Sequence, residues 1–389
     1  MVVTPDRVAV FETRGGKLIT EIDPLDVTWK ATTNEPETVK VTIDLNSSTE
    51  RRRNWRSLAT PWKHSVAYEK GGRVYGGPIL PHDFDDDAAE LTFTGRGFRI
   101  LMAAQGRRLG RTVLPAAALT QPLTLPNRLP DTSLDTVLNG YDLGTIGKKL
   151  VEQACQWPGW DDLPIVFPPD RAGSHTRTYP AIERKNLDSA LSDLSGVANG
   201  PDFRFQLERI GSDFYQWRFD SGSEAQPRLE SPDVFAWEVG QGSGLSVVSD
   251  PSQMGSLSWS EGGRASDTVL VRSLYNPTLV DNGYPLLELE SDASVNTDAP
   301  ETLDSWNVET LRTSTLPWEF WSFKVKADEP PFLGEYREGD LIDVVITEDS
   351  PVAGGYISPG TYRRRIASLD GDLSEWVTVT CGEEYPSYG

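Results

Sequence analysis

Cysteine is scarce in this sequence. Only Cys155 and Cys381 occur among 389 residues, and they lie far apart. This argues against a disulfide framework and against a zinc site built from thiolate pairs, so both are expected to be reduced core residues. No apolar run is long enough to cross a bilayer, and the opening Met-Val-Val-Thr-Pro-Asp-Arg lacks the basic and apolar regions of a signal peptide. We therefore expect no membrane anchor, and synthesis and folding in a cytoplasm.

The familiar catalytic signatures are absent as well. The sequence has no Gly-x-Ser-x-Gly elbow, no His-Glu-x-x-His, no Cys-x-x-Cys and no phosphate loop ending in Gly-Lys-Ser/Thr. Its three histidines, His64, His82 and His175, have no partner at metal-ligand spacing and are expected on the surface or in turns. We expect no catalytic, cofactor-binding or metal-binding residue, and no enzyme. A pair of glycosidase carboxylates stays open, because their separation is a three-dimensional quantity.

Basic residues are outnumbered. The chain has 37 Lys and Arg against 58 Asp and Glu, which gives a formal net charge of −21. Such a field repels the phosphate backbone that nucleic-acid-binding proteins attract, so tight DNA binding is disfavoured. A polyanion could still slide past an acidic wall, because the wall offers it no cationic sites.

Short stretches of alternating apolar and polar residues dominate both ends of the chain. The clearest is 39–45, where Val39, Val41, Ile43 and Leu45 alternate with polar residues, as in a half-buried strand. Further strands are expected at 7–12, 27–31, 65–69, 73–80, 90–94, 268–272, 321–325, 341–346, 362–369 and 376–380, with a brief helix at 98–104. Because 34 Gly and 28 Pro supply the turns, this spacing predicts small barrels or sandwiches.

The middle of the chain differs. Residues 106–142 carry four prolines and little periodicity, which predicts an extended arm or long loop. Apolar residues at helical spacing predict helices at 143–154 and 187–198, and 203–219 reads as a hairpin around a central Gly-Ser-Asp. Residues 291–305 are polar and acidic and are expected to form an exposed loop.

These patterns predict a mainly β protein, α+β overall, in three domains. Two small β-barrel domains, residues 1–105 and 236–389, flank the extended arm and α+β middle domain of residues 106–235. The C-terminal barrel is expected to carry loop insertions.

Two distant segments share one layout: a strand, an acidic turn, an alternating strand and a glycine. They span 79–95 and 366–382. A β-hairpin generates this pattern by itself, and that local explanation is favoured over a duplicated barrel. The duplication gains weight only in combination with other signs of a repeat.

Acidic residues gather at the turns of these two segments, namely Asp83, Asp85, Asp86 and Asp87 in the first and Asp370 and Asp372 in the second. The first run lacks the glycine at the sixth position and the distal Glu of an EF-hand loop. Solvated hairpin tips are therefore favoured over a calcium site.

Twelve tryptophans raise the possibility of carbohydrate binding, since exposed indole faces stack on sugars. Trp157 and Trp160 flank a Pro-Gly turn and are the candidate glycan contacts. Large aromatics more often pack in cores or subunit contacts, which is the favoured interpretation.

An order of features in the first hundred residues resembles a known family. It consists of Leu25-Asp26-Val27-Thr28-Trp29, the strand 39–45, the strand 64–69, Val74-Tyr75-Gly76-Gly77-Pro78-Ile79, and Leu91-Thr92-Phe93-Thr94-Gly95 leading into 98–101. This order is similar to the amino-terminal domain of phage tail-hub and minor tail proteins, including the hub-like minor tail proteins of siphophages that infect actinobacteria. Residues 186–205, 336–346 and 362–367 fit the later domains of that family.

The resemblance implies a structural protein of the virion, located at the phage tail tip and made in the host cytoplasm. Two tail-tube-like barrels per subunit would form a trimeric, quasi-sixfold ring that closes or continues the tail tube and lets DNA pass. Its partners would be further copies of itself, distal tail or tail-tube proteins, the tape-measure protein and other minor tail proteins. The acidic turns would face the channel without binding DNA. A receptor- or carbohydrate-binding tail protein is the alternative, and a tail-associated hydrolase is a third hypothesis.

Overall fold

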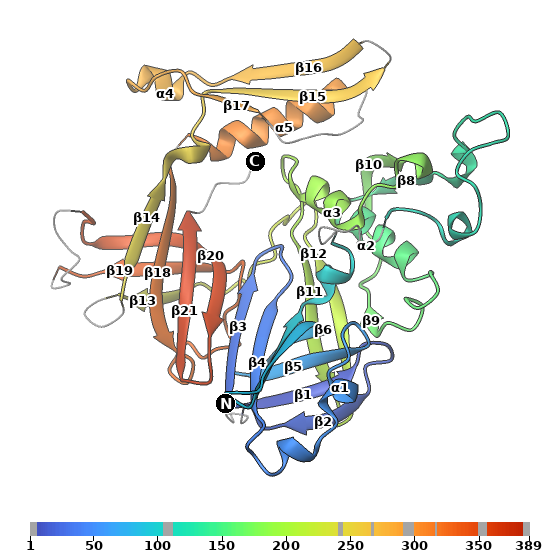
Figure 1. The fold of residues 1–389 in the computed structure, drawn as a ribbon. Coiled ribbons are helices and arrows are strands. Elements are labelled where there is room, and N and C mark those ends of the chain that lie inside the picture. The colour runs from blue at the N-terminus through green and yellow to red at the C-terminus, as the bar shows by residue number, and fades with distance from the viewer. Residues whose placement is uncertain are drawn as a thin grey trace.

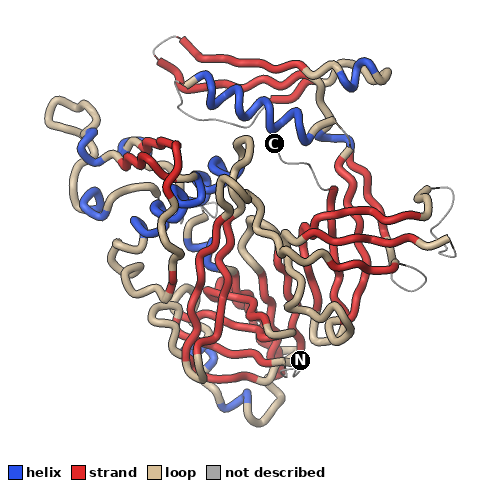
Figure 2. Tube along the Cα trace, turned by 180° about the vertical axis from the view of Figure 1, so that it is seen from behind, coloured by secondary structure: helices blue, strands red, loops and turns tan. Residues whose placement is uncertain are grey.

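The computed structural model describes residues 6–103, 112–239, 244–265, 268–290, 299–315, 317–348 and 356–383. Strands make up most of its regular structure (Figure 2). Two sheets adjoin, one from the N-terminal strands (blue in Figure 1) and one from the C-terminal strands (red), and the green middle segment packs beside the first. A yellow and orange unit stands beyond the second sheet. The mainly β fold class is therefore confirmed.

The N-terminal strands are β1 (Arg7–Glu12), β2 (Leu18–Ile22), β3 (Asp26–Thr32), β4 (Thr38–Asp44), β5 (His64–Lys70), β6 (Arg73–Asp85) and β7 (Glu90–Arg96). They pair in the order β2-β1-β5-β6-β7-β4-β3. The expected strands of this region are confirmed, and the expected helix at 98–104 is a 3₁₀ turn, Phe98–Leu101. The alternation of buried and exposed residues along β3 and β4 places one face of the sheet on a core.

The middle segment contains β8 (Thr136–Tyr141), α2 (Leu143–Ala154), β9 (Ile165–Val166), β10 (Ala172–Tyr179), α3 (Leu187–Ser195), β11 (Phe203–Ile210) and β12 (Phe214–Ser221). Both predicted helices and the predicted hairpin are confirmed. Each helix begins at a capping side chain, because Asp142 accepts from the N–H of Thr145 and Asn186 from that of Ser189. In the expected arm, 106–142, short 3₁₀ turns precede β8, so the prediction of an arm or loop is wrong for 136–141. Residues 106–111 lie outside the described part of the chain. The hairpin β11–β12 joins the N-terminal sheet where Leu207 pairs with Val74 of β6.

The C-terminal strands are β13 (Phe235–Glu238), β14 (Ser246–Asp250), β18 (Trp318–Lys326), β19 (Leu341–Ile346), β20 (Gly360–Gly371) and β21 (Trp376–Glu383). They pair in the order β13-β19-β20-β21-β18-β14.

A further unit is inserted in the sequence between β14 and β18. It comprises β15 (Leu257–Ala265), β16 (Thr268–Tyr275), α4 (Thr278–Asp281), β17 (Glu288–Glu290) and α5 (Pro300–Thr313). The expectation of a loop through residue 305 is wrong for 300–305, which form the start of α5. Pro300 at the first position and Glu301 in the first turn favour a helix start, and Leu303, Trp306 and Leu311 form its buried face. Residues 291–298 lie outside the described part of the chain.

The two sheets repeat one strand order. In the first, β3-β4-β7-β6-β5-β1 run side by side, and in the second, β14-β18-β21-β20-β19-β13 do. The equivalent strands also follow one another in the same sequence order, and only the pairing of β13 with β19 is parallel where that of β1 with β5 is antiparallel. A single hairpin does not generate a matching order of six strands. The layout shared by 79–95 and 366–382 is therefore part of a repeat of the whole sheet.

The two sheets are joined into one by the pairing of β3 with β20. One hydrophobic core spans both of them. A second core is formed by the middle segment, the back of β1 and β5, and Leu303 and Trp306 of α5. Among the described residues the ladders do not close into a barrel. The three domain boundaries expected from the sequence stay a prediction.

Candidate assembly site

The longest strands of the two sheets, β6 and β20, bend in the same way. The first half of β6 pairs with β5 and its second half with β7, and a bulge follows Ile79. The first half of β20 pairs with β19 and its second half with β21, and a bulge follows Ile366. The carbonyl of Ile79 accepts from the N–H of Trp62, as that of Ile366 does from Gly339. Each hairpin therefore bends at its bulge. We call the part beyond the bulge the β6 arm, residues 81–85, and the β20 arm, residues 368–371.

The arm of β20 forms the seam with the N-terminal sheet. It pairs antiparallel with β3, and Asp370 lies opposite Lys30. Burial raises the pKa of the Asp370 carboxyl, while a hydrogen bond from Thr378 and the charges of Lys30 and Lys324 oppose that rise. A row of side chains on the face opposite the core thus connects four strands across the seam. It consists of Lys30 of β3, Asp370 of β20, Thr378 of β21 and Lys324 of β18.

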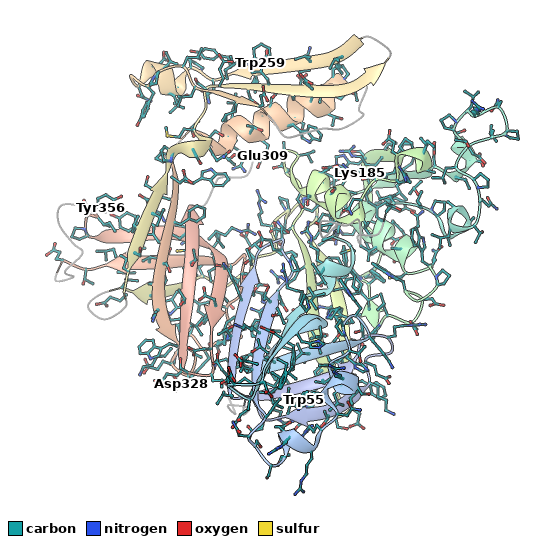
Figure 3. All side chains as sticks on the ribbon, in the orientation of Figure 1. Trp55, Lys185, Trp259, Glu309, Asp328 and Tyr356 are labelled. Atoms are coloured by element: carbon teal, nitrogen blue, oxygen red, sulfur yellow. The ribbon has the colours of Figure 1, made fainter. Side chains whose placement is uncertain are left out.

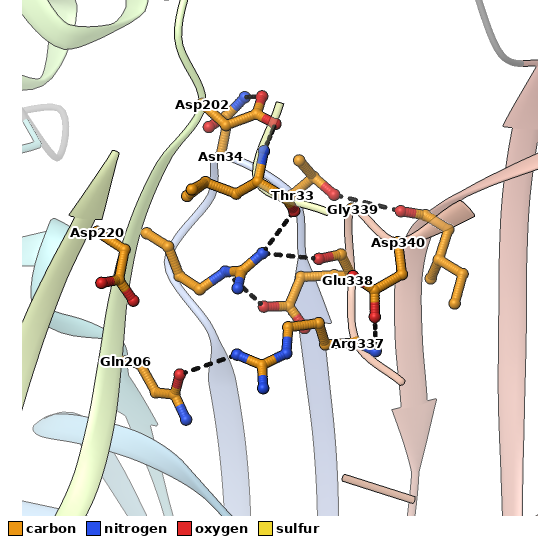
Figure 4. Close-up of polar contacts among 12 residues, drawn as sticks. Thr33, Asn34, Asp202, Gln206, Asp220, Arg337, Glu338, Gly339 and Asp340 are labelled. Carbon is orange, nitrogen blue, oxygen red and sulfur yellow. Dashed lines mark hydrogen bonds and ion pairs between the residues drawn. The ribbon is translucent and has the colours of Figure 1, made fainter. Parts of the chain in front are cut away.

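A buried polar junction lies beside the seam, where both sheets meet the middle segment (Figure 4). Its centre is Asp202, whose carboxylate accepts from Asn34 at 2.9 Å, from the N–H of Leu229 at 2.9 Å and from Arg365. Burial raises the pKa of Asp202, but the charges of Arg365 and Arg228 outweigh it and hold that pKa below its ordinary value. One carboxylate thus links three parts of the chain that are remote in sequence.

A second buried ion pair connects the two sheets directly. Arg73 of β6 donates to both carboxylate oxygens of Glu338, at 2.9 and 3.2 Å. Arg204 of β11 approaches the same carboxylate, at 3.6 Å. Glu37 is buried nearby, and desolvation together with the charge of Glu338 raises its pKa to about 8. The junction therefore holds one carboxyl group that is protonated at neutral pH.

This shift predicts a pH-dependent stability. Because the pKa of Glu37 is raised from 4.5 to about 8, its contribution is fully present below pH 4.5 and is lost as the pH rises through 8. Glu37→Gln cannot ionise, so its melting temperature should equal that of the wild type near pH 5 and exceed it by a few degrees at pH 9. Thermal unfolding at several pH values measures this, with the exposed Glu35→Gln as control. An equal difference at pH 5 and pH 9 would contradict it.

The face of the joined sheets that points away from the core is rich in threonine and lysine. Thr92 of β7 lies between Asp83 of β6 and Thr42 of β4 and is paired with both. The hydroxyl oxygens of Thr42 and Thr92 are 3.1 Å apart. The face continues through Thr28, Lys30, Lys40, Thr94, Lys324, Thr378 and Thr380. We call it the polar face.

The acidic residues selected from the sequence lie at the ends of the two arms. Asp83 and Asp85 are the last exposed residues of β6 together with Phe84, and Asp86 and Asp87 form the turn that follows. Asp370 lies within β20, and Asp372 in the next turn accepts from the N–H of Ser374. Asp83 and Asp370 are both on the polar face, opposite Thr92 and Thr378.

The candidate glycan contacts lie in the second core. Trp157 and Trp160 are each 4% exposed, and the indole of Trp157 donates to the carbonyl of Leu114 at 2.9 Å. Stacking on a sugar would require both side chains to leave this core. The exposed Trp259 lies instead on the inserted unit (Figure 3).

The two cysteines are unpaired thiols. Cys381 is buried and Cys155 is partly buried, and burial raises the pKa of each thiol to about 12. All three histidines lie in strands. The expected surface position is wrong for His64, which is buried at the start of β5, whereas His82 in β6 is exposed and His175 in β10 is partly buried. No group of three or more His, Cys, Asp or Glu side chains in the described part of the chain is placed to hold a metal ion. No helix found there is long and apolar enough to span a membrane.

Sequence reasoning did not find the junction residues. Asp202 and Arg365 are 163 residues apart, and neither lies in a recognisable motif. The local feature that could have drawn attention to Asp202 is its position after Pro201, directly before the predicted hairpin of 203–219.

Comparisons with known proteins identify the class of fold. No family model matches the sequence, and no curated protein matches it. Solved structures of two tail proteins share this fold, which agrees at the level of the fold with the resemblance inferred from the sequence. One is the 43 kDa tail protein of prophage MuSo2 from Shewanella oneidensis, with a TM-score of 0.54 and 11% identity over 97% of this chain and 98% of that one. Another is the tail protein from Neisseria meningitidis MC58, with a TM-score of 0.53 and 13% identity over 98% and 97%.

Proposed function

We propose that this chain is a structural hub, or minor tail protein, of a phage tail tip or baseplate. In this role three copies form a ring that closes or continues the tail tube and lets DNA pass. The observation that carries the proposal is the repeated sheet: one chain presents the same strand order twice, joined edge to edge by β3 and β20. Three such chains supply six similar sheets, which is what docking on a sixfold tube requires.

The partners of the ring would be distal tail or tail-tube proteins, the tape-measure protein and other minor tail proteins, and its location the tail tip of the virion. The role is structural and not enzymatic. Support comes from the fold shared with two tail proteins over nearly the full length of each.

The polar face is the surface we assign to the channel. It carries hydroxyl groups and a few lysines, and the acidic ends of both arms, including Asp83 and Asp370, lie on it or beside it. Threonine hydroxyls and scattered charges of both signs give a polyanion no continuous cationic track. The acidic turns at 85–87 and 372 would then face the passage.

Electron microscopy of assembled tails tests this function. We expect three copies of the chain around the channel at the tip, with the polar face and the acidic turns towards the lumen. A position in the capsid, or a single copy beside the tube, would contradict the proposal.

A further inference from the structure

Several strand edges have no partner in the described part of the chain, and two of them lie at corresponding places in the repeat of the two sheets. One is the outer edge of β14, which pairs only with β18. The other is the outer edge of the β6 arm, residues 81–85, which pairs only with β7 and is exposed throughout. Val248 on the first edge is 57% exposed and Phe84 on the second is 55% exposed. Unpaired edges of this kind are templates for another strand.

The repeat shows that these two edges correspond to the two that already form the seam. In the first sheet one row of core residues runs across β3, β4, β7 and β6, and in the second a row runs across β14, β18, β21 and β20. The first row is Trp29, Val39, Gly95 and Ile79, and the second is Val247, Trp321, Cys381 and Ile366. Thus β14 is the equivalent of β3, and the arm of β6 is the equivalent of the arm of β20.

Counting from these rows gives residue equivalences. Val248 follows Val247 as Lys30 follows Trp29. On the arms, Asp83 lies four residues after Ile79, as Asp370 lies four after Ile366, with one bulge in each interval. Since Lys30 and Asp370 are opposite each other in the seam, their equivalents define a second pairing.

We propose that β14 of one copy pairs antiparallel with the β6 arm of the next copy, in the register of the seam, so that Val248 lies opposite Asp83. The partner is a second copy of this chain. The proposal rests on the proposed function, because it names the contact that would close the ring.

The backbone of both edges suits this register. In the seam the N–H of Thr33 donates to the carbonyl of Ala367 at 3.0 Å, and hydrogen-bonded pairs alternate from there. Ser368 therefore directs its backbone away from β3, and its equivalent on the β6 arm is Pro81. A proline is tolerated there, because its missing N–H would not have pointed at the partner. By the same alternation Ser249 directs its N–H outward, as Val247 does two residues earlier.

The two edges differ in sequence and shape, and this determines how copies associate. Each chain carries one edge of each kind, so the contact between copies is head to tail. An open assembly therefore has a free β14 edge at one end and a free β6 arm at the other. The ring closes where the β6 arm of the last copy meets β14 of the first.

Disulfide cross-linking of the purified full chain tests the register. Opposite residues of a non-hydrogen-bonded pair lie about 4.5 Å apart at Cα, which is within the range that a disulfide spans. Val248→Cys combined with Asp83→Cys should give covalent dimers and trimers on oxidation. The matched control is Val248→Cys with Asp85→Cys, whose residues on the same face are displaced by two positions and lie roughly 7–8 Å apart. The control should cross-link at least about tenfold less, and the wild type gives the background of the native thiols.

A second variant tests the same edge without cysteines. Ser249→Pro removes the outward N–H from an exposed position, so light scattering should show a monomer while the melting temperature of that monomer stays unchanged. Absence of the cross-link in the variant that combines Val248→Cys and Asp83→Cys would overturn the pairing, whether the wild-type chain is a monomer or an oligomer. An oligomer without this cross-link leaves the hub function standing, whereas a cross-linked ring located outside the tail would refute the function and keep the pairing.

Discussion

Replacing Gly76 with alanine is expected to prevent stable folding of the chain. Gly76 has φ +131°, and an added Cβ would lie 2.1 Å from the carbonyl oxygen of Val66. That oxygen belongs to the backbone of β5, so the clash cannot be relieved by a side-chain movement. We expect a loss above about 4 kcal/mol, measured by urea unfolding, because backbone strain and steric overlap add.

The matched control is Gly72→Ala. Gly72 also has a positive φ, +76°, but an added Cβ there meets no atom within 4 Å. This variant should lose only the cost of a left-handed alanine, roughly 1–2 kcal/mol. Equal losses in the two variants would show that the close approach of β5 and β6 does not require Gly76.

Asp202→Ala is expected to cost about 3–5 kcal/mol, because it leaves Arg365 partly buried without its charge partner and removes the acceptor for Asn34 and for the N–H of Leu229. Urea unfolding followed by tryptophan fluorescence measures the loss. Since the junction joins both sheets to the middle segment, the transition should also lose cooperativity.

An exposed ion pair provides the comparison for Asp202. Asp304 of α5 accepts two hydrogen bonds from Arg272 on the surface of the inserted unit, each at 2.8 Å. Asp304→Ala should leave the unfolding midpoint unchanged, because solvent screens such pairs. A loss for Asp202→Ala as small as that for Asp304→Ala would mean that the junction does not hold the three parts together.

The local elements of this fold were predictable, and the reason is visible in particular segments. Alternation in 39–45 and helical spacing in 143–154 depend only on neighbours in sequence, and both predictions are confirmed. The layout shared by 79–95 and 366–382 was visible in the sequence too. Its meaning was not, because a hairpin explains it until the order of the neighbouring strands is known.

The candidate site was largely beyond sequence reasoning. Pairing of β3 with β20 brings together residues such as Lys30 and Asp370, and no local pattern encodes that contact. The charged groups around Asp202 look like ordinary surface residues in sequence, since burial becomes apparent only when three parts of the chain meet. The acidic turns were found because their composition is local, and their orientation towards a channel stays a prediction.

The inserted unit has a consequence for symmetry. β3 and β4 are connected by a short turn, whereas β14 and β18 are separated by β15, β16, β17 and α5 (Figure 1). A closed assembly of three copies would therefore repeat six times where its sheets line the passage, but only three times where these units protrude. In the proposed ring, a component that binds the inserted units would therefore be present in three copies, whereas one that docks on the sheets would meet six similar surfaces.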